Sequence, residues 1–218
     1  MSRAAAFAPY ALVSILHVVA LGTGWADGST WTKPLLMPAL FLALVLAVPM
    51  RRSRLLVVTA LAIVCSWAGD VLLETPGDVG FLLGLGAFLL AHLAYIALFV
   101  GPLRERRIPL GTLTFLGWWG ALVLVLAPDA GPLLVPVALY GIVLAGSGAT
   151  AFGANRFVAI GALVFLASDT LLAFRLFRPD FDPWQIDAII MLLYTAGQGL
   201  IVWGAVTRAR TVPSRPVG

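Results

Sequence analysis

The amino-acid sequence predicts an all-α membrane protein, a polytopic bundle of eight transmembrane helices. Hydrophobic residues make up 61% of the 218 residues and charged residues only 11%, and the mean hydropathy is +1.01. A soluble domain carries about a quarter charged residues, so this chain has too little charge for a water-facing surface. The apolar residues also gather in runs long enough to cross a bilayer, separated by short turn and charge clusters.

The residues that flank the first four runs support their assignment as membrane spans. The run 8–24 follows Arg3 and is not followed by a small-x-small cleavage site, which favours a retained signal anchor. The second run begins at Pro34, whose missing N–H costs nothing in the first turn of a helix. The third follows the loop RRSR (51–54), and the fourth ends before the loop GPLRERRIP (101–109).

The last four runs are separated by three polar or proline-rich connections, PDAGP (128–132), FGANR (152–156) and RPDFDPW (178–184). No connection is long enough to separate two domains, so we expect a single transmembrane domain over 1–218, with a flexible C-terminal tail at 207–218. The expected spans are 8–24, 34–49, 55–73, 81–100, 110–127, 132–150, 156–177 and 185–206.

The basic residues predict the orientation of the bundle. In this arrangement eleven of the fourteen Lys and Arg residues fall on one side of the membrane, and only Lys33, Arg175 and Arg178 fall on the other. Cytoplasmic loops carry the excess of Lys and Arg, so we expect both termini in the cytoplasm of a bacterial-type plasma membrane. The basic loops orient the chain, and we expect no nucleic-acid partner. The single cysteine, Cys65, excludes an intrachain disulfide.

Two carboxylates stand inside apolar runs, Asp70 in SWAGDVLLE (66–74) and Asp169 in LASDTLLAFRLF (166–177). An intramembrane carboxylate is costly and is a functional hypothesis by default. Asp70 precedes Tyr95 by 25 residues, and Asp169 precedes Tyr194 by 25 residues. The offset of 99 residues suggests two parallel repeats of four helices, which would bring the two aspartates together.

Other polar residues share helix faces with these groups. Ser66, Asp70 and Glu74 follow one another at spacings of four, which places them on one stripe. Lipid offers polar side chains no partner, so such stripes should face one another around an internal polar cavity. By the same reasoning we expect Lys33 at the rim of this cavity. From the later spans we expect His92, Tyr95, Tyr194 and Gln198 to face it.

Each of these residues also has a structural interpretation. Lys33 and Glu74 are typical of snorkelling or helix-end charges, and Ser66 and Gln198 of side chains that join helices. Tyr95 and Tyr194 are compatible with core or interfacial packing. His17, which follows Tyr10 and Ser14 along the first span, is interpreted as a packed or hydrogen-bonded helix residue.

Five segments in order resemble the YhhN family of lysoplasmalogenases: KPLLMPAL, SWAGDVLLE, GAFLLAHLAYIALF, the SD of the seventh span and YTAGQG. The resemblance covers nearly the whole chain and implies hydrolysis of the vinyl ether bond of lysoplasmalogens, with alkenyl-glycerophosphoethanolamine or -choline giving a fatty aldehyde and a glycerophospho-alcohol. It also implies that Asp70 and Asp169 are the essential aspartates. The implied partners are a lysophospholipid substrate and membrane lipids, and the oligomeric state stays open.

The implied reaction needs acid chemistry, because a vinyl ether has no carbonyl group to attack. We expect Asp70 and Asp169 to act as an acid/base pair that titrates as a unit, so the sequence leaves open which one holds the proton. His92, Tyr194 and Gln198 would orient water or the ether oxygen, and Lys33 would hold the phosphate. No metal and no cofactor is required.

Four other functions are compatible with parts of the sequence. A proton-coupled transporter of an amphiphile would also use intramembrane carboxylates. Asp70, Asp169 and His92 could nominally bind zinc in a ceramidase-like lipid amidase, although zinc sites favour several histidines and the chain has two. A serine hydrolase is disfavoured because no G-x-S-x-G motif is present. An intramembrane aspartyl protease is disfavoured because no glycine precedes Asp169.

Overall fold

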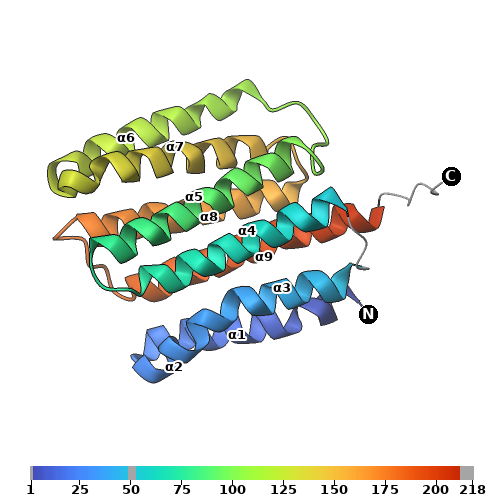
Figure 1. Cartoon of the computed structure of the whole chain (residues 1–218), viewed down its shortest axis with the longest axis horizontal. Coiled ribbons are helices and arrows are strands. Elements are labelled where there is room, and N and C mark those ends of the chain that lie inside the picture. Colours follow the sequence, from blue (N-terminus) through green and yellow to red (C-terminus); the bar gives the residue numbers. More distant parts are fainter. Residues whose placement is uncertain (1, 49–52, 212–218) are drawn as a thin grey trace.

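The computed structural model describes residues 2–48 and 53–211, and over these ranges the chain is helical without a β-strand. Its helices lie side by side in one bundle (Figure 1). The start of α1 and the end of α9 lie at the same end of the bundle, which we name the basic end because α1, α4 and α8 each begin there with an arginine. The long helices are α1 (Arg3–Thr23), α3 (Leu36–Ala47), α4 (Arg54–Leu73), α5 (Asp78–Val100), α6 (Thr114–Ala130), α7 (Leu134–Ala151), α8 (Arg156–Phe177) and α9 (Ile186–Thr211).

The N-terminal part contains more helix than the sequence predicts. The first helix begins five residues before the expected span, because the Ser2 side chain caps it by accepting a hydrogen bond from Ala5 N. The expected loop before Pro34 is also helical, forming α2 (Ala26–Thr32) and a 3₁₀ turn, η1 (Lys33–Leu35). Here the hydroxyl groups of Thr30 and Thr32 bond back to carbonyl groups one turn earlier, which gives these hydroxyl groups partners that lipid does not supply.

Two pairs of antiparallel helices form the centre of the bundle, α4 with α5 and α8 with α9. In the second pair Gly161 and Gly197 face each other so closely that a side chain would clash. A Cβ atom on Gly197 would lie 2.9 Å from the Gly161 backbone oxygen. Small residues allow such close approach of membrane helices, where packing replaces the hydrophobic effect.

The described residues contain seven segments long and apolar enough to cross a membrane, where the sequence predicts eight. The difference lies in Leu110–Ala151, which has 42 residues and includes η2 (Leu110–Leu113), α6, η3 (Gly131–Leu133) and α7. The chain reverses at Gly131, whose φ of 49° favours glycine. Helices α6 and α7 consequently lie against each other (Figure 1).

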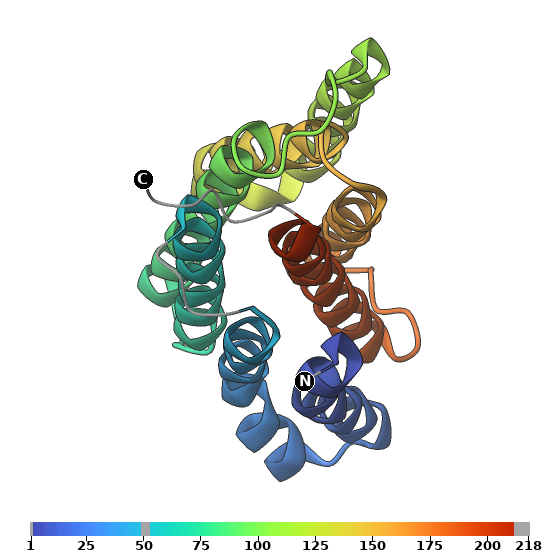
Figure 2. The same ribbon diagram turned by 90° about the vertical axis from the view of Figure 1, so that its right-hand side faces the viewer.

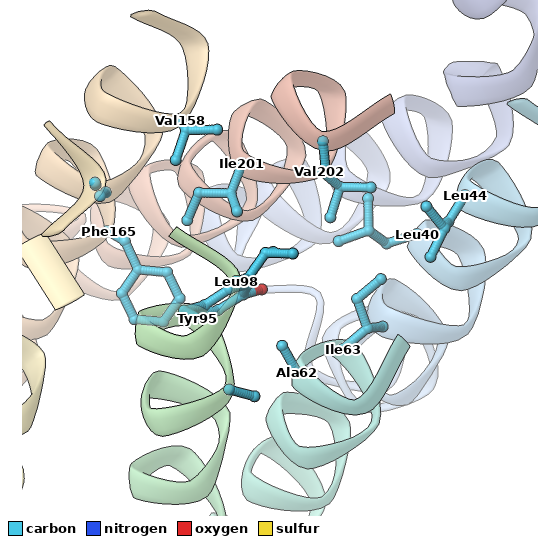
Figure 3. Packing of buried hydrophobic residues seen from close by; sticks show 14 of the residues in the cluster. Leu40, Leu44, Ala62, Ile63, Tyr95, Leu98, Val158, Phe165, Ile201 and Val202 are labelled. Carbon is cyan, nitrogen blue, oxygen red and sulfur yellow. The ribbon is translucent and has the colours of Figure 1, made fainter. Parts of the chain in front are cut away.

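The end-on view shows the helices arranged in a ring (Figure 2). The pair α4 and α5 lies opposite the pair α8 and α9, with α1 to α3 on one side and α7 with the outlying α6 on the other. Buried apolar side chains from α3, α4, α5, α8 and α9 meet in the half of the bundle nearer the basic end (Figure 3). These include Leu40, Ile63, Leu98 and Val202, each at most 1% exposed. This core closes one half of the ring, so space for a site remains in the other half.

The C-terminal helix extends beyond the expected last span. Helix α9 continues to Thr211, five residues into the stretch expected to be a tail, because contacts hold its end in place. Arg3 Nη1 donates to Thr207 Oγ1 at 2.9 Å, and Arg210 donates to the Ala47 carbonyl oxygen. Residues 212–218 of the expected tail and Arg51 and Arg52 of the RRSR loop lie outside the described residues.

Candidate functional site

Asp70 lies in the last turn of α4 and is 5% exposed. Its Oδ2 atom accepts a hydrogen bond of 2.7 Å from the Tyr194 hydroxyl group on α9. The two residues are 124 positions apart in the sequence, so the bond joins the two central helix pairs. A hydroxyl donor is the type of partner that lets a carboxyl group remain inside a bilayer.

Asp169 lies deeper than Asp70, eight residues before the end of α8, which is about 12 Å of helix. Its Oδ2 atom accepts a hydrogen bond from the Tyr140 hydroxyl group on α7. The neighbouring Ser168 donates to the Ile190 carbonyl oxygen at 2.9 Å and so ties α8 to α9 beside the carboxyl group. Each intramembrane aspartate therefore has its own tyrosine, and Oδ1 of each has no hydrogen-bond partner in the described part of the chain.

Two adjoining cavities open in the half of the bundle away from the core. The first, which we name the polar cavity for the polar part of its wall, has a volume of about 540 Å³. Its polar wall includes His17, Ser29, Thr30 and Asp187, and the rest of its wall is apolar, formed by Leu21, Pro34, Val71, Leu172, Ile190 and Met191. The second, the apolar cavity, has a volume of about 300 Å³. It is lined mainly by Leu73, Phe81, Leu85, Phe88, Val137, Leu172, Leu176 and Phe177, together with Tyr140, Asp169 and Tyr194.

Asp70 lines both cavities, as do Lys33 and Glu74. Asp70 therefore lies where the two cavities meet, and it shares the walls of the apolar cavity with Asp169. Both predicted catalytic residues face one space, although 99 residues separate them in the sequence.

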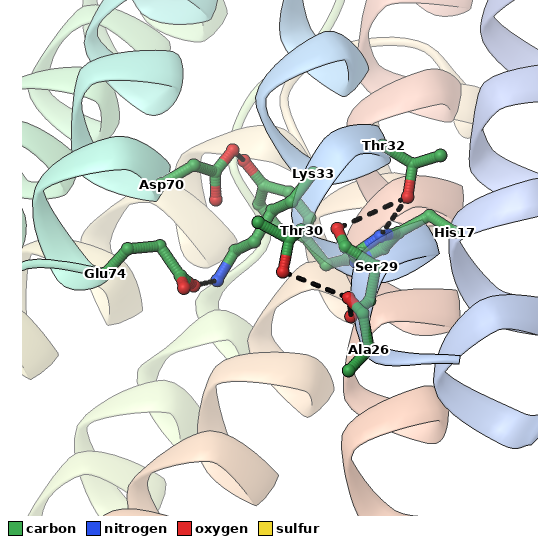
Figure 4. A network of polar contacts seen from close by, with 9 residues as sticks. His17, Ala26, Ser29, Thr30, Thr32, Lys33, Asp70 and Glu74 are labelled. Carbon is green, nitrogen blue, oxygen red and sulfur yellow. Dashed lines mark hydrogen bonds and ion pairs between the residues drawn. The ribbon is translucent and has the colours of Figure 1, made fainter. Parts of the chain in front are cut away.

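An ion pair lies at the edge of both cavities. The Lys33 ammonium group, at the start of η1, pairs with the Glu74 carboxylate at the end of α4. Figure 4 shows Asp70 and Glu74 on the same helix with Lys33 beside Glu74, and it shows His17, which also lines the polar cavity, beside Thr32. The Glu74 side chain is 65% exposed, so the pair lies at the opening of the site.

Three of the predicted orienting residues form a buried chain behind the cavities. Tyr95 donates to Gln198 Oε1, and Gln198 Nε2 donates to Ser66 Oγ at 3.0 Å. This chain joins α5, α9 and α4, and all three side chains are fully buried. None of them lines either cavity, so the geometry places them where they hold helices together.

His92 also lies outside the cavity walls. It is 2% exposed and is surrounded by the rings of Phe165, Tyr140 and Tyr95, with centroid distances of 4.8, 5.7 and 6.0 Å. Neither ring nitrogen has a hydrogen-bond partner among the residues that the structure describes. His92 therefore packs behind Tyr140 and does not reach the space that water or a substrate would occupy.

Two residues near the aspartates were not among the predicted site residues. Tyr140, the partner of Asp169, is one of only four tyrosines, and all four lie within helices long enough to span a membrane. An intramembrane tyrosine needs a partner for its hydroxyl group, which is the signal that could have identified Tyr140. His17, which the sequence predicts to be a structural residue, lines the polar cavity.

Side chains that could bind a metal ion do not gather at one place among the described residues. Over residues 2–48 and 53–211, no group of three or more His, Cys, Asp and Glu side chains is placed to hold a metal ion. Asp70, Asp169 and His92, the set considered for the alternative of a zinc-dependent amidase, do not converge, because His92 lies behind the aromatic rings.

Relatives of the chain from mammals and mycobacteria share one name, lysoplasmalogenase. The YhhN family model matches residues 28–205. The lysoplasmalogenase TMEM86B of Sus scrofa is 33% identical over 141 residues, which are 64% of this chain and 59% of the relative. The lysoplasmalogenase TMEM86B of Homo sapiens is 32% identical over 145 residues, 66% of this chain and 61% of the relative.

A bacterial relative matches over a longer stretch. The lysoplasmalogenase of Mycobacterium bovis (strain ATCC BAA-935 / AF2122/97) is 33% identical over 182 residues, 74% of this chain and 67% of the relative. The chain thus spans about three fifths of the length of the mammalian relatives and two thirds of the mycobacterial one. No solved structure was found to match the chain.

Proposed function

The chain belongs to the YhhN family, and from this premise we propose that it is a membrane-embedded hydrolase that cleaves the vinyl ether bond of lysoplasmalogens. The names of its relatives support this activity. The observation that carries the proposal is geometric: Asp70 and Asp169 line one apolar cavity inside the membrane-spanning bundle, and each accepts a hydrogen bond from a tyrosine.

The two cavities fit the two parts of a lysolipid. The polar cavity, with Lys33 at its edge, takes the glycerophospho headgroup, and the apolar cavity takes the alkenyl chain. The vinyl ether joins these two parts of the lipid, so it lies at the junction that Asp70 lines. The exposed Trp31 and Trp184 at this end of the bundle are typical of the membrane interface, where the headgroup of a lipid resides.

The reaction begins with a proton transfer to carbon. One aspartic acid donates its proton to the β-carbon of the vinyl ether, and the π electrons form the new C–H bond. The α-carbon is left as an oxocarbenium ion, which the resulting carboxylate stabilises electrostatically in the water-poor cavity. This step requires a carboxyl group that still holds its proton when substrate arrives.

Water then completes the hydrolysis. The second carboxylate removes a proton from water as the water oxygen bonds to the α-carbon, which gives a hemiacetal. The hemiacetal collapses when the bond from the α-carbon to the glycerol oxygen breaks. The glycerol oxygen takes a proton, the hydroxyl group loses one, and the products are a fatty aldehyde and a glycerophospho-alcohol.

The tyrosines keep the aspartates ready for these roles. Tyr194 and Tyr140 each occupy Oδ2 of their aspartate, which leaves Oδ1 to exchange a proton with substrate or water. In this scheme Ser66, Tyr95, Gln198 and His92 are positioning residues, because they contact the helices and rings that carry the aspartates and tyrosines.

We also propose that the chain crosses the membrane eight times with both termini in the cytoplasm. Helices α6 and α7 are a hairpin of 17 and 18 residues, about 26 Å each, so each is long enough to cross most of a bilayer core. Counting them separately gives an even number of crossings, as the shared location of the first and last helix ends requires (Figure 1). Under this proposal the cavities open on the non-cytoplasmic side, and the two sets of four helices are candidates for a parallel repeat.

The activity is tested with purified protein in detergent and a panel of ether and ester lysolipids, analysed by mass spectrometry. The proposal predicts aldehyde release from alkenyl lysolipids alone, with one deuterium at C2 of the aldehyde when the reaction runs in D₂O, because the proton goes to the β-carbon. Hydrolysis of saturated-ether or ester lysolipids only, to a fatty alcohol or a fatty acid, would refute it. A transporter would release no aldehyde in detergent, where no gradient exists.

A further inference from the structure

Of the two imidazoles in the chain, that of His17 lines one of the two cavities and that of His92 lines neither. His17 lies on α1 and is 1% exposed, yet it belongs to the wall of the polar cavity that Asp70 also lines. Its Nε2 atom has no hydrogen-bond partner among the described residues. A buried ring nitrogen without a partner costs stability, so such an atom in a cavity wall points to a ligand that supplies the partner.

The other ring nitrogen fixes which atom carries the hydrogen. His17 Nδ1 lies 2.9 Å from Thr32 Oγ1. The Thr32 hydroxyl group has a single hydrogen, and it donates that hydrogen to the Gly28 carbonyl oxygen at 2.6 Å. The Ser29 carbonyl oxygen lies 3.3 Å from the same hydroxyl group, so two backbone acceptors compete for its hydrogen. We infer that Thr32 accepts from His17, which puts the imidazole hydrogen on Nδ1. In the neutral ring Nε2 then carries only a lone pair, and it can accept a hydrogen bond but not donate one.

We propose that His17 is a specificity-determining residue whose Nε2 atom accepts a hydrogen bond from the free sn-2 hydroxyl group of a lysolipid. This inference rests on the proposed function for the identity of the lipid. The sn-2 hydroxyl group is attached to the carbon next to the one that bears the sn-1 ether oxygen. A lipid whose vinyl ether lies beside Asp70 therefore presents this hydroxyl group inside the same cavity.

The chemistry of the cavity favours a hydroxyl donor over the other donor in such a lipid, an ethanolamine ammonium group. An ammonium ion is costly to bury, whereas the cost of burying a hydroxyl group is much smaller once it donates a hydrogen bond in the site. Three carboxyl groups line this cavity. Asp70 is buried, accepts from Tyr194 and is assigned to the reaction. The side chains of Glu74 and Asp187 are 65% and 60% exposed and are the ones open to an ammonium group. The ammonium group would thus remain at the opening, while His17 lies at 1% exposure. A phosphate oxygen, being an acceptor, cannot satisfy Nε2.

The proposal explains how a lysolipid would be distinguished from a lipid with two chains. An sn-2 ester has no hydrogen to donate, so its binding would leave Nε2 buried and unpaired. A site built to bond a hydroxyl group discriminates strongly against the analogue that lacks it. Selection against the second chain therefore comes from a missing donor as well as from the volume of the cavity.

The test compares an alkenyl-glycerophosphoethanolamine with its 2-deoxy analogue. For the wild-type protein we expect kcat/KM to be at least about tenfold higher for the substrate with the hydroxyl group, the size expected for an unpaired buried polar group. In His17→Asn the shorter amide reaches Thr32 but not the position of Nε2, and the ratio should fall to within about twofold of one. His17→Gln places an amide oxygen near the position of Nε2 and should restore part of the ratio.

Two further arms make the result decisive. Replacing ethanolamine by choline removes the ammonium donors, and the wild-type ratio of kcat/KM with and without the hydroxyl group should persist. Loss of this ratio with choline would overturn the proposal in favour of the ammonium group. Binding of a saturated-ether lysolipid and its 2-deoxy analogue, followed as a shift in Tm, measures the hydroxyl preference without hydrolysis. No aldehyde release together with hydroxyl-dependent binding would refute the proposed function alone. Equal binding and equal turnover of both analogues would refute the role of His17.

Discussion

Replacing Tyr194 with phenylalanine removes one hydroxyl group from the candidate site and leaves its ring in place. The ring packs edge-on against Phe165 and Phe88, with centroid distances of 5.4 and 6.2 Å, so Tyr194→Phe keeps these contacts. The variant loses the 2.7 Å hydrogen bond to Asp70. A hydrogen bond to a charged group contributes about 1.5–3 kcal/mol. If this bond stabilises the carboxylate formed after proton transfer, its loss lowers kcat about 10- to 150-fold, at 1.36 kcal/mol for each factor of ten.

The assay is the initial rate of aldehyde release from a saturating alkenyl lysolipid, with Tm measured on the same preparation. Tyr140→Phe should show a loss of the same order, because Tyr140 has the same relation to Asp169. Tyr10→Phe is the matched control. Its hydroxyl group donates to the Thr195 carbonyl oxygen at 2.6 Å and lines neither cavity, so its loss should lower Tm and leave kcat within about twofold. Wild-type turnover in Tyr194→Phe, with an unchanged Tm, would refute this reasoning.

Three other predictions concern stability, binding and topology. Gly197→Ala should destabilise the protein by about 1–3 kcal/mol, seen as a lower Tm in detergent, because its Cβ would lie 2.9 Å from a backbone oxygen of α8; Gly86→Ala, with open space around it, should change Tm little. Lys33→Gln should raise KM for phosphate-bearing lysolipids with little change in Tm, since its ion-pair partner is exposed and such pairs contribute at most about 1 kcal/mol; an unchanged KM would exclude a role in headgroup binding. In a Cys65→Ser background, Pro132→Cys in the α6–α7 turn should react with an impermeant maleimide added outside intact cells, and reaction only after lysis would contradict the eight-crossing arrangement.

The apolar runs of the sequence correspond to helices of the structure, because hydropathy and the turn and charge clusters between the runs depend on local residues. The boundaries were less predictable where polar side chains extend a helix. Ser2 caps α1, and Thr32 bonds back within α2, which are short-range effects of single hydroxyl groups. The predicted spans 110–127 and 132–150 both correspond to helices, and the turn between them is so tight that one apolar segment of 42 residues results.

The sequence also identifies Asp70 and Asp169 as the unusual residues, because carboxylates are rare inside apolar runs. It marks Tyr140 as an intramembrane tyrosine whose hydroxyl group needs a partner, but it could not identify Asp169 as that partner, since tertiary packing decides which helix lies against α8 at that depth. His92 and Tyr95 are three residues apart on one helix, but they lie 14 and 17 residues after the start of α5, which is deeper in the bundle than the aspartates. Both rings lie toward the closed core, whereas the cavities are lined by residues nearer the opposite end.

The most direct test of the central claim is the rate of aldehyde release by Asp70→Asn and Asp169→Asn, each purified and shown by Tm to be folded. Asparagine keeps the shape of the side chain and an oxygen that can accept the tyrosine hydrogen bond, but it cannot donate or accept the catalytic proton. Acid–base catalysis by a single group contributes about 10²–10⁴-fold, so each variant should lose at least a hundredfold in kcat. Turnover near the wild-type rate in either folded variant would contradict the assignment of both carboxyl groups to the reaction.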